Sequence, residues 1–382
     1  MAMIVRAANF VAPRSGGIRT ALDAIGRGYL AAGHEPVLVV PGRRDADVPT
    51  PAGRRISLRG VPLPSSGGYR VLVERGRVLR LLERLGPDRL EVSDKLTLGC
   101  LGPWARARGI PAVLVSHERL DRLLALRLPG SGSAPRLARA WNRRLAAGFD
   151  TVVCSTRWAA EEFQGLGPAA VAQVPLGVDL TAFDPANASP RLRRRLAPGG
   201  GPLLVCAGRL APEKRPELAV AALAELLGRW PRARLVMAGS GPLGRRLAGL
   251  AGGLPVSFLG HLADREELAA LLATADVAIA PGPVETFGLA ALEALASGTP
   301  VVVARGGGLP ELLGDDGHPD NGRAGAGLAA HPFASAMADA VAAVLAWDPA
   351  ERRARARARA ARYPWSATVA GMLNVHALEG GP

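Results

Sequence analysis

The stretch that decides the fold reads PGPVETFGLAALEALASGTPVVV and covers residues 281–303. The apolar run ADVAIAP leads into it and the apolar run PVVVAR ends it, and both predict short buried strands. Between them Gly288 predicts a turn, and the spacing of Leu289, Leu292 and Leu295 predicts a helix. A strand, a turn and a helix that lead into another strand form a unit of a parallel sheet, where ligands bind at the carboxyl ends of the strands. The stretch therefore predicts an α/β protein with a ligand site in this turn.

Two acidic residues, Glu285 and Glu293, lie eight positions apart in this stretch. Glu285 falls in the turn, and Glu293 lies roughly 12 Å further along the helix axis. Carboxylates this far apart cannot share a proton or a metal ion, but they can hold two ends of an elongated ligand such as a nucleotide sugar. Glycosidases need their two carboxylates within about 10 Å of each other, facing across the scissile bond, and this arrangement does not fit.

The spacing E-x7-E with F-G-L inside it resembles the donor-binding motif of retaining glycosyltransferases of the GT-B fold, family 4. The resemblance implies that Glu285 hydrogen-bonds hydroxyls of the donor sugar and that Glu293 binds the ribose. It also implies that the backbone amides around Phe287, Gly288 and Leu289 face the sugar and the phosphate. The alternative is an ordinary amphipathic helix with two solvated glutamates.

A second candidate motif lies in the segment PLLVCAGRLAPEKRPELAVAALAELL, which predicts a strand, a loop and a helix. Arg209 and Lys214 lie five positions apart in the loop, where a guanidinium fork and an ammonium can converge on a diphosphate. Almost every basic residue of this chain is arginine, so a lysine is informative; the other lysine is Lys95. The pattern resembles the diphosphate clamp of the same family, which implies that it neutralises the departing nucleotide.

A glycine turn and a histidine in the first half complete the predicted site. Gly16 and Gly17 open a helix after the first predicted strand, and amides at a helix N-terminus bind phosphate well. The resemblance implies that this turn approaches the donor diphosphate, although a plain tight turn is the alternative. His117 ends the predicted strand PAVLVSH, and the resemblance implies a histidine near the donor sugar there. The strings SHERLD and VSDKLTL are similar to those of actinobacterial GDP-mannose-dependent α-mannosyltransferases that modify membrane glycolipids.

At 382 residues the chain is long enough for two domains. We expect an N-terminal acceptor-binding domain over residues 1–185 and a C-terminal donor-binding domain over residues 186–363, with a Pro-, Arg- and Gly-rich linker at 185–201. The resemblance implies that a final helix within 364–382 packs back on the first domain. The resemblance implies that both are Rossmann-like domains with doubly wound parallel sheets, facing a cleft.

The positive charge is concentrated in the first half: residues 1–180 contain 26 basic and 15 acidic residues, and the remainder contains 21 and 18. Residues 69–86 predict a basic amphipathic helix whose arginines form a membrane or acceptor surface; these are Arg70, Arg77, Arg80 and Arg84. An ordinary surface helix is the equal alternative. Seven more arginines between Arg119 and Arg144 favour the membrane. The Arg-Ala alternation after residue 351 predicts a solvated helical face.

Several function classes receive no support from the sequence. No apolar run reaches the roughly 18–20 residues of a membrane span, and the apolar N-terminus is too short for a signal peptide. The three cysteines have no metal spacing, which favours a reducing cytoplasm. Two acidic pairs, Asp45 with Asp47 and Asp315 with Asp316, are interpreted as solvated loop carboxylates. We therefore expect chemistry that needs neither a metal nor a cofactor beyond the nucleotide-sugar donor.

The sequence predicts a retaining hexosyltransferase that moves mannose from GDP-mannose to a lipid-linked acceptor at the inner face of the plasma membrane. His117 and Glu285 would orient the sugar. One alternative is a UDP-sugar-dependent glycosyltransferase with a soluble acceptor, or a GT-B sugar-nucleotide epimerase. A remote alternative is an Arg-rich nucleic-acid binder, but aromatic residues for base stacking do not alternate with the basic ones.

Overall fold

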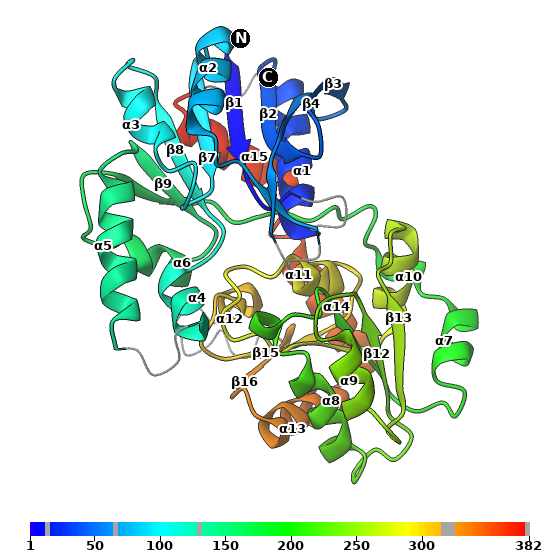
Figure 1. Ribbon diagram of the computed structural model, residues 1–382. Coiled ribbons are helices and arrows are strands. Elements are labelled where there is room, and N and C mark those ends of the chain that lie inside the picture. Colours follow the sequence, from blue (N-terminus) through cyan, green and yellow to red (C-terminus); the bar gives the residue numbers. More distant parts are fainter. Residues whose placement is uncertain (12–15, 64–67, 128–131, 315–324, 379–382) are drawn as a thin grey trace. The chain divides into compact units, whose positions relative to one another are not determined.

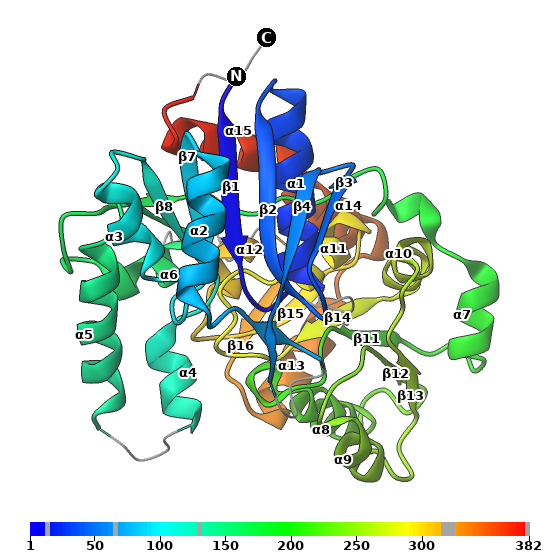
Figure 2. The ribbon, with the colours of Figure 1, turned by 45° about the horizontal axis from the view of Figure 1, so that its top comes forward.

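The chain forms two compact α/β units. The computed structural model describes all residues except 12–15, 64–67, 128–131, 315–324 and 379–382. The first unit comprises Met1–Gly177 and Trp365–Pro382, and the second comprises Val178–Pro364. In both, helices cover a central sheet (Figures 1 and 2).

The first unit is built on an eight-stranded sheet with the strand order β10-β9-β8-β7-β1-β2-β4-β3. All neighbouring strands run parallel except β3, which is antiparallel to β4. A two-stranded hairpin of β5 and β6 lies outside this sheet. The strands are β1 Met3–Ala8, β2 Glu35–Gly42, β3 Ala46–Thr50, β4 Gly53–Arg59, β5 Val61–Pro62, β6 Arg70–Val71, β7 Arg89–Ser93, β8 Ala112–Ser116, β9 Thr151–Cys154 and β10 Ala170–Gln173.

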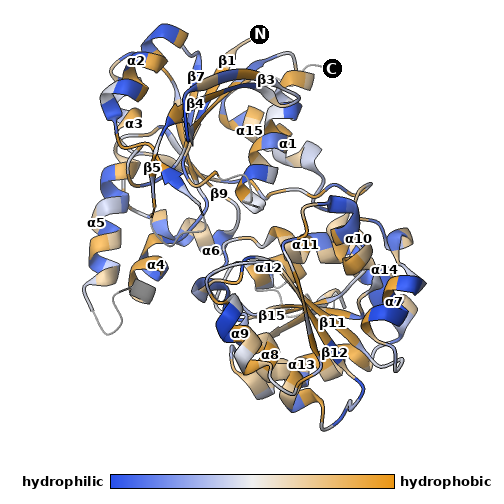
Figure 3. Cartoon of the chain, turned by 45° about the vertical axis from the view of Figure 1, so that its right-hand side comes forward, coloured by the Kyte–Doolittle hydropathy of each residue, from blue (hydrophilic) through white to orange (hydrophobic). Residues whose placement is uncertain are grey.

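The central strands of the first unit are buried along most of their length, as expected for parallel strands covered on both faces. The helices of this unit are α1 Gly17–Ala31, α2 Arg75–Leu85, α3 Leu101–Arg106, α4 Leu120–Arg127, α5 Ala134–Ala146, α6 Arg157–Ala160, the 3₁₀ turn η1 Glu161–Phe163 and α15 Trp365–Val375. Figure 3 shows apolar strands flanked by helices that carry the polar residues outward.

The last helix, α15, packs on α1 in the first unit. Gly28 of α1 leaves room for Val369 of α15, because a Cβ at this position would overlap the valine side chain. A buried polar cluster joins the same elements: Glu91 of β7 accepts hydrogen bonds from Arg6 (2.9 Å), Tyr29 and His376 (2.9 Å). Burial raises the pKa of Glu91, but Arg6, His376 and Tyr29 together lower it to about 2.

The second unit contains a six-stranded, fully parallel sheet with the order β13-β12-β11-β14-β15-β16, which is the doubly wound order of Rossmann-like domains. Its strands are β11 Leu203–Ala207, β12 Arg234–Ala238, β13 Val256–Gly260, β14 Val277–Ala280, β15 Val301–Ala304 and β16 Gly327–Ala330. Its helices are η2 Pro185–Asn187, α7 Pro190–Leu196, η3 Pro212–Lys214, α8 Glu217–Leu226, α9 Gly244–Leu250, α10 Arg265–Thr274, α11 Leu289–Ala296, α12 Leu309–Leu313, α13 Ala334–Leu345 and α14 Pro349–Ala360.

The division between the units lies at residue 177, not at the expected 185. The segment after residue 177 already belongs to the second unit: the amide of Val178 donates to the carbonyl of Tyr363 (2.9 Å), and Val178 forms a parallel bridge with Pro364. The expected linker at 185–201 is also wrong. It contains η2 and α7, because Ser189 caps the amide of Leu192 and a proline begins the helix.

The prediction of a solvated face on α14 is wrong as well. Its arginines reach the last carbonyls of neighbouring helices, which have no partners within their own helices. Arg353 donates to the carbonyls of Ala273 and Ala275 at the end of α10, Arg357 donates to that of Ala296 of α11 (2.7 Å), and Arg359 donates to that of Leu312 of α12 (2.7 Å). The Arg-Ala pattern therefore places guanidinium groups against helix C-termini, where positive charge is favourable.

Candidate functional site

Glycines bring loops of the second unit together at the carboxyl edge of its sheet. The loop after β11 bonds the loop after β12 through the amide of Gly208 to Ala238 (2.9 Å) and the amide of Leu210 to Ser240 (3.0 Å). A Cβ on Gly239 would overlap the carbonyl oxygen of Gly208. The close approach of these two backbones therefore requires glycine and fixes the loop that carries the predicted cationic residues.

Lys214 and Glu285 form a hydrogen-bonded ion pair across this edge. Lys214 ends η3 in the loop after β11, and Glu285 lies in the loop between β14 and α11. The two side chains are 35% and 20% exposed, so solvent and ligands reach both. Arg209 lies in the same loop as Lys214 and pairs with Glu213. The structure thus brings together two of the predicted donor-binding residues and places the third nearby.

A glycine turn supports the backbone of Glu285. The amide of Gly308 donates to the carbonyl of Glu285 (2.7 Å). A Cβ on Gly307 would lie 2.9 Å from the same carbonyl oxygen and 3.1 Å from that of Pro283, so a larger residue would push the loop away. The turn after β15 therefore holds the Glu285 loop in position.

Gly288 turns the chain into α11, as the sequence predicts. It has a φ of 84°, which favours glycine, and a Cβ there would overlap the side chain of Leu309. The helix begins at Leu289, so the first amides of α11 follow directly after the Glu285 loop. These amides have no acceptors within the helix and can bind an anion.

The side chain of Phe287 is buried in the second unit, so of this residue the backbone is the part that can contact a ligand. Its ring packs edge-on against Tyr363, with 6.0 Å between centroids. Arg359 of α14 donates to the hydroxyl of Tyr363 (2.9 Å) and places its guanidinium 5.4 Å from that ring. Tyr363 and Arg359 support Phe287, but no local motif predicts this, because they lie about 75 positions after Phe287 in the chain.

Glu293 lies in α11 with a side chain that is 13% exposed, 3.6 Å from the guanidinium of Arg265. Burial raises the pKa of Glu293 to about 7, and the charge of Arg265 opposes this effect. Near neutral pH the carboxyl group is therefore divided between its two protonation states. Either state can hydrogen-bond hydroxyl groups, but the carboxylate accepts from both of its oxygens.

His117 follows β8 at the carboxyl edge of the first unit's sheet and is half-buried. Burial, with the positive charges of Lys95 and Arg6, lowers its pKa to about 4. The imidazole is therefore neutral at physiological pH and can both donate and accept a hydrogen bond.

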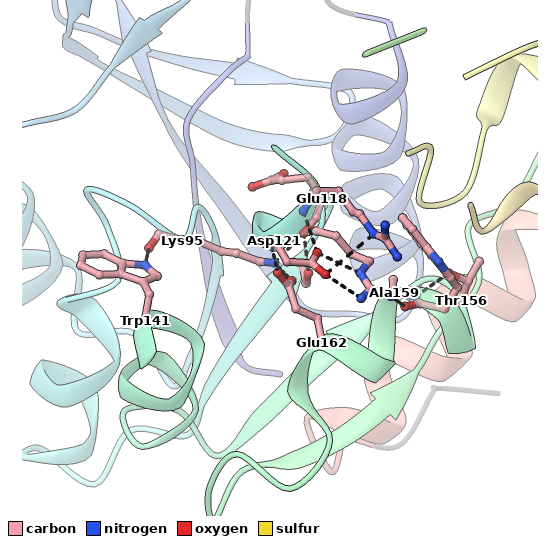
Figure 4. A network of polar contacts seen from close by, with 11 residues as sticks. Lys95, Glu118, Asp121, Trp141, Thr156, Ala159 and Glu162 are labelled. Atoms are coloured by element: carbon pink, nitrogen blue, oxygen red, sulfur yellow. Dashed lines mark hydrogen bonds and ion pairs between the residues drawn. The ribbon is translucent and has the colours of Figure 1, made fainter. Parts of the chain in front are cut away.

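A charged network supports the loop that carries His117 (Figure 4). Lys95, whose side chain is 2% exposed, donates to Glu162 (2.7 Å) and to the carbonyl of Glu118 (2.5 Å). Arg119 bonds both oxygens of Asp121 (3.1 and 2.8 Å). Lys95 thus joins the loops after β7 and β8 to η1. The sequence offered the same signal for Lys95 as for Lys214, namely a lysine in an arginine-rich chain.

Gly16 and Gly17 lie at the start of α1 in the first unit. Gly16 is the N-cap, and its carbonyl accepts from the amide of Thr20 (3.1 Å). A Cβ on Gly16 would meet no atom within 4 Å, so open space adjoins the helix start. Ser15, which precedes this turn, lies outside the described residues.

The four arginines predicted to share one basic helix face do not do so. The helix α2 begins at Arg75, so Arg70 lies in β6 instead, where it donates to the carbonyl of Gly60 (2.6 Å). Arg77 pairs with Asp45. Arg80 and Arg84 remain exposed on α2. The prediction of a helix over 69–86 is wrong at its start because residues 70–71 pair with β5.

Asp45 lies in the loop between β2 and β3, as expected, whereas Asp47 lies in β3; both carboxylates are about half exposed. Asp45 accepts from the amide of Arg59 (2.7 Å), and Asp47 makes two hydrogen bonds to Arg54 (2.9 and 2.7 Å). Their carboxylates therefore bind arginines and backbone of the hairpin. Asp315 and Asp316 lie outside the described residues. Within the described parts of the chain, no helix is both long and apolar enough to cross a bilayer.

Comparison with known proteins agrees with this architecture. Residues 16–177 match the glycosyl transferase 4-like domain, and residues 190–362 match glycosyl transferases group 1. The chain is 46% identical over 371 residues to a GDP-mannose-dependent alpha-(1-6)-phosphatidylinositol dimannoside mannosyltransferase of Mycobacterium tuberculosis, covering 97% of this chain and 94% of the relative. It is 32% identical over 318 residues to the corresponding monomannoside mannosyltransferase of Mycolicibacterium smegmatis, covering 79% and 80%.

Solved structures show the same fold. A sucrose-phosphate synthase from Thermosynechococcus elongatus superimposes with a TM-score of 0.77 at 23% identity, covering 99% of this chain and 98% of that one. The Anabaena protein HepE, in complex with UDP and glucose, gives 0.74 at 18% identity, covering 99% and 100%. The chain therefore belongs to the family 4 glycosyltransferases, and its two Rossmann-like units are those of the GT-B fold.

Proposed function

We propose that this protein is an α-mannosyltransferase that moves mannose from GDP-mannose to a phosphatidylinositol mannoside with retention of configuration. The observation that carries the proposal is the 46% identity, over almost the whole chain, to an enzyme named for that reaction. The Lys214–Glu285 pair, held by a glycine turn at the carboxyl edge of the second sheet, provides the matching chemistry.

In this proposal the second unit binds the donor. Arg209 and Lys214 bind the diphosphate, which replaces their present carboxylate partners as the counter-charge. The release of Lys214 frees Glu285 to accept hydrogen bonds from mannose hydroxyls. The first amides of α11, around Phe287, Gly288 and Leu289, face the phosphate, and Glu293 accepts from the ribose hydroxyls.

The reaction breaks the bond between the anomeric carbon and the phosphate oxygen, and the acceptor hydroxyl forms its bond on the same face of the sugar. The acceptor proton passes to the departing phosphate oxygen. Positive charge develops on the sugar and negative charge on the diphosphate, where the two cationic side chains and the amides stabilise it. These groups supply the role that a divalent ion plays elsewhere, so we propose a reaction without a metal ion or other cofactor.

The first unit contributes the acceptor side of the proposal. Neutral His117 donates or accepts a hydrogen bond at a sugar hydroxyl, and the amides at Gly16 and Gly17 approach the diphosphate. Because the acceptor is a membrane glycolipid, we place the enzyme at the inner face of the plasma membrane as a peripheral protein. Neither a nucleic acid nor a soluble acceptor has a part in this proposal.

A donor and acceptor matrix tests the proposal. Purified protein is supplied with radiolabelled GDP-mannose, UDP-glucose or UDP-galactose, each with phosphatidylinositol mono- or dimannoside, and lipid-extractable label is measured. We expect transfer from GDP-mannose alone, in the presence of EDTA as well, and a product that an α-mannosidase cleaves. Efficient transfer from a UDP-sugar, or a β-linked product, would overturn it.

A further inference from the structure

One helix of the first unit presents a face of basic and apolar side chains that no described residue covers. On α5 the buried residues lie on one side, and eight exposed residues fill the rest of the circumference. The exposed residues of this face are Pro135, Arg136, Leu137, Arg139, Ala140, Trp141, Arg143 and Arg144. Figure 3 shows charged and apolar bands alternating along this helix.

The four arginines of this face lie within nine residues of one helix. None of them makes an ion pair or side-chain hydrogen bond with any residue that the structure describes. By contrast, the arginines of α14 bind helix carbonyls, and Arg77 of α2 pairs with Asp45. Four neighbouring cations without counter-charges indicate an anionic partner outside the chain.

Apolar side chains lie beside these cations. Leu137 and Trp141 are one helical turn apart and are 54% and 38% exposed. The indole N–H of Trp141 donates to the carbonyl of Lys95 (2.8 Å), which holds the loop after β7 against α5 (Figure 4). The next residue of that loop, Leu96, is 49% exposed. Leu96, Leu137 and Trp141 thus form an exposed apolar group at the edge of a basic helix face.

We propose that this α5 surface, defined as Leu96 with the exposed residues of α5, lies on an anionic phospholipid bilayer. The inference rests on the proposed glycolipid acceptor. Cations without partners match the negative surface potential of such a bilayer, and the apolar side chains enter the region between headgroups and acyl chains. A soluble acidic protein would satisfy the cations but would leave the three apolar side chains without a matching hydrocarbon phase.

The network of Figure 4 connects the α5 surface to the acceptor side of the site. Trp141 bonds the backbone of Lys95, and the ammonium of Lys95 bonds the backbone of Glu118, which follows His117 directly. All these residues belong to the first unit. These hydrogen bonds connect the helix that is proposed to lie on the bilayer with the loop that carries His117, the residue proposed to contact sugar hydroxyls.

Vesicle co-sedimentation of the full-length protein tests this surface. Vesicles of equal parts phosphatidylcholine and phosphatidylglycerol are compared with vesicles of phosphatidylcholine alone. The test variant is Arg143→Gln/Arg144→Gln. The matched control is Arg245→Gln/Arg246→Gln, which removes two neighbouring exposed arginines from α9 of the second unit. A third variant, Arg80→Gln/Arg84→Gln, measures the contribution of α2.

We expect the α5 variant to lose roughly tenfold or more of its partitioning to anionic vesicles, and the α9 variant to match the unsubstituted protein. Equal losses in the α5 and α9 variants would show general attraction of a basic protein and would overturn the proposal. A loss confined to the α2 variant would assign the contact to the other helix and overturn it too.

A second measurement tests whether Trp141 enters the acyl-chain region of the bilayer. Brominated acyl chains are expected to quench tryptophan fluorescence of the bound protein, and Trp141→Phe is expected to lose most of that quenching while still binding. Unchanged quenching in Trp141→Phe would contradict insertion at this position. These measurements require neither donor nor acceptor, so their failure is separate from a failure to transfer mannose.

Discussion

Glu293 carries a carboxyl group that burial brings to a pKa near neutral. Burial raises its pKa to about 7 from an ordinary value of 4.5, so its contribution to stability is present below pH 4.5 and is lost as pH rises through 7. Ribose hydroxyls that donate to the carboxylate would favour the charged form. Nucleotide binding should therefore release a proton from this group.

Calorimetric titration with GDP measures this coupling. Because the bound state favours the carboxylate, we expect affinity to rise about tenfold between pH 6 and pH 8. Glu293→Gln should bind GDP more weakly and with a much flatter pH dependence. An affinity that does not change with pH in the unsubstituted protein would exclude the proposed contact between Glu293 and the ribose.

The lowered pKa of His117 predicts a loss of stability at acidic pH. Its pKa is lowered to about 4 in the folded protein, so the stability it contributes is present above the ordinary value of 6.5 and is lost as pH falls toward 4. Between pH 7 and pH 5 this residue should cost the fold about 2 kcal/mol. The free energy of urea unfolding in His117→Gln should fall by that much less over the same interval. Equal falls in both proteins would contradict the lowered pKa of His117.

At the scale of elements, α14 supports the helices that surround the site. Its arginines bind carbonyls at the ends of α10, α11 and α12, and α11 carries Glu293. The helix-forming composition of this segment predicted a helix, although the Arg-Ala alternation has the period of a strand, but the predicted environment of the helix was wrong. An alternation of arginine and alanine is typical of a solvated face, and nothing local in the sequence shows that helix C-termini lie beside it.

Two neighbouring arginines of α14 allow a matched comparison. Arg353 donates to Ala273 and Ala275, whereas Arg355 pairs with Glu351 at the surface. Arg353→Met removes the donor to the carbonyl of Ala273 and one of two donors to that of Ala275, and should lower the free energy of unfolding by about 2 kcal/mol. Arg355→Met should change it by less than about 0.5 kcal/mol. Chemical denaturation of the second unit measures both, and equal effects would show that the capping bonds contribute little.

The elements were predictable where the pattern was local. Residues 281–303 predicted the turn at Gly288 and the helix at Leu289, and both are present. Residues 69–86 did not predict the start of α2, because the pairing of Arg70 with Pro62 depends on a strand outside the window. The supporting contact of Tyr363 with Phe287 was beyond prediction for the same reason, since it joins segments distant in sequence.

At the scale of the whole molecule, the chain passes from the first unit to the second and returns. The return segment, α15, completes the core of the first unit by packing on α1 and by bringing His376 to Glu91. The chain length predicted two domains, and the family resemblance implied that they are Rossmann-like and that the last helix returns to the first. The predicted boundary lies eight residues too late, because the pairing of Val178 with Pro364 joins segments distant in sequence and no local pattern shows it.

Fragments of the chain test this organisation. Residues 178–364 contain the entire second unit and should fold cooperatively alone. Residues 1–177 lack α15, which exposes Ile4, Ile25 and Tyr29 and leaves Glu91 without His376. We expect this fragment to unfold at a markedly lower temperature, and a peptide of residues 365–382 to restore stability when added. Equal melting temperatures of the fragment with and without the peptide would contradict the role of α15.

The central claim is that Lys214 binds the diphosphate of the sugar donor and Glu285 binds its sugar hydroxyls. The most direct measurement is kcat/KM for GDP-mannose in Lys214→Met and Glu285→Gln. Each should lose at least about a hundredfold, because Lys214 stabilises the charge on the departing diphosphate and Glu285 orients the sugar through its hydroxyls. The double variant should lose less than the product of the two, since the residues act as a pair. The control Arg245→Met should stay within about twofold. If both single variants retained the activity of the unsubstituted protein, the account would be wrong.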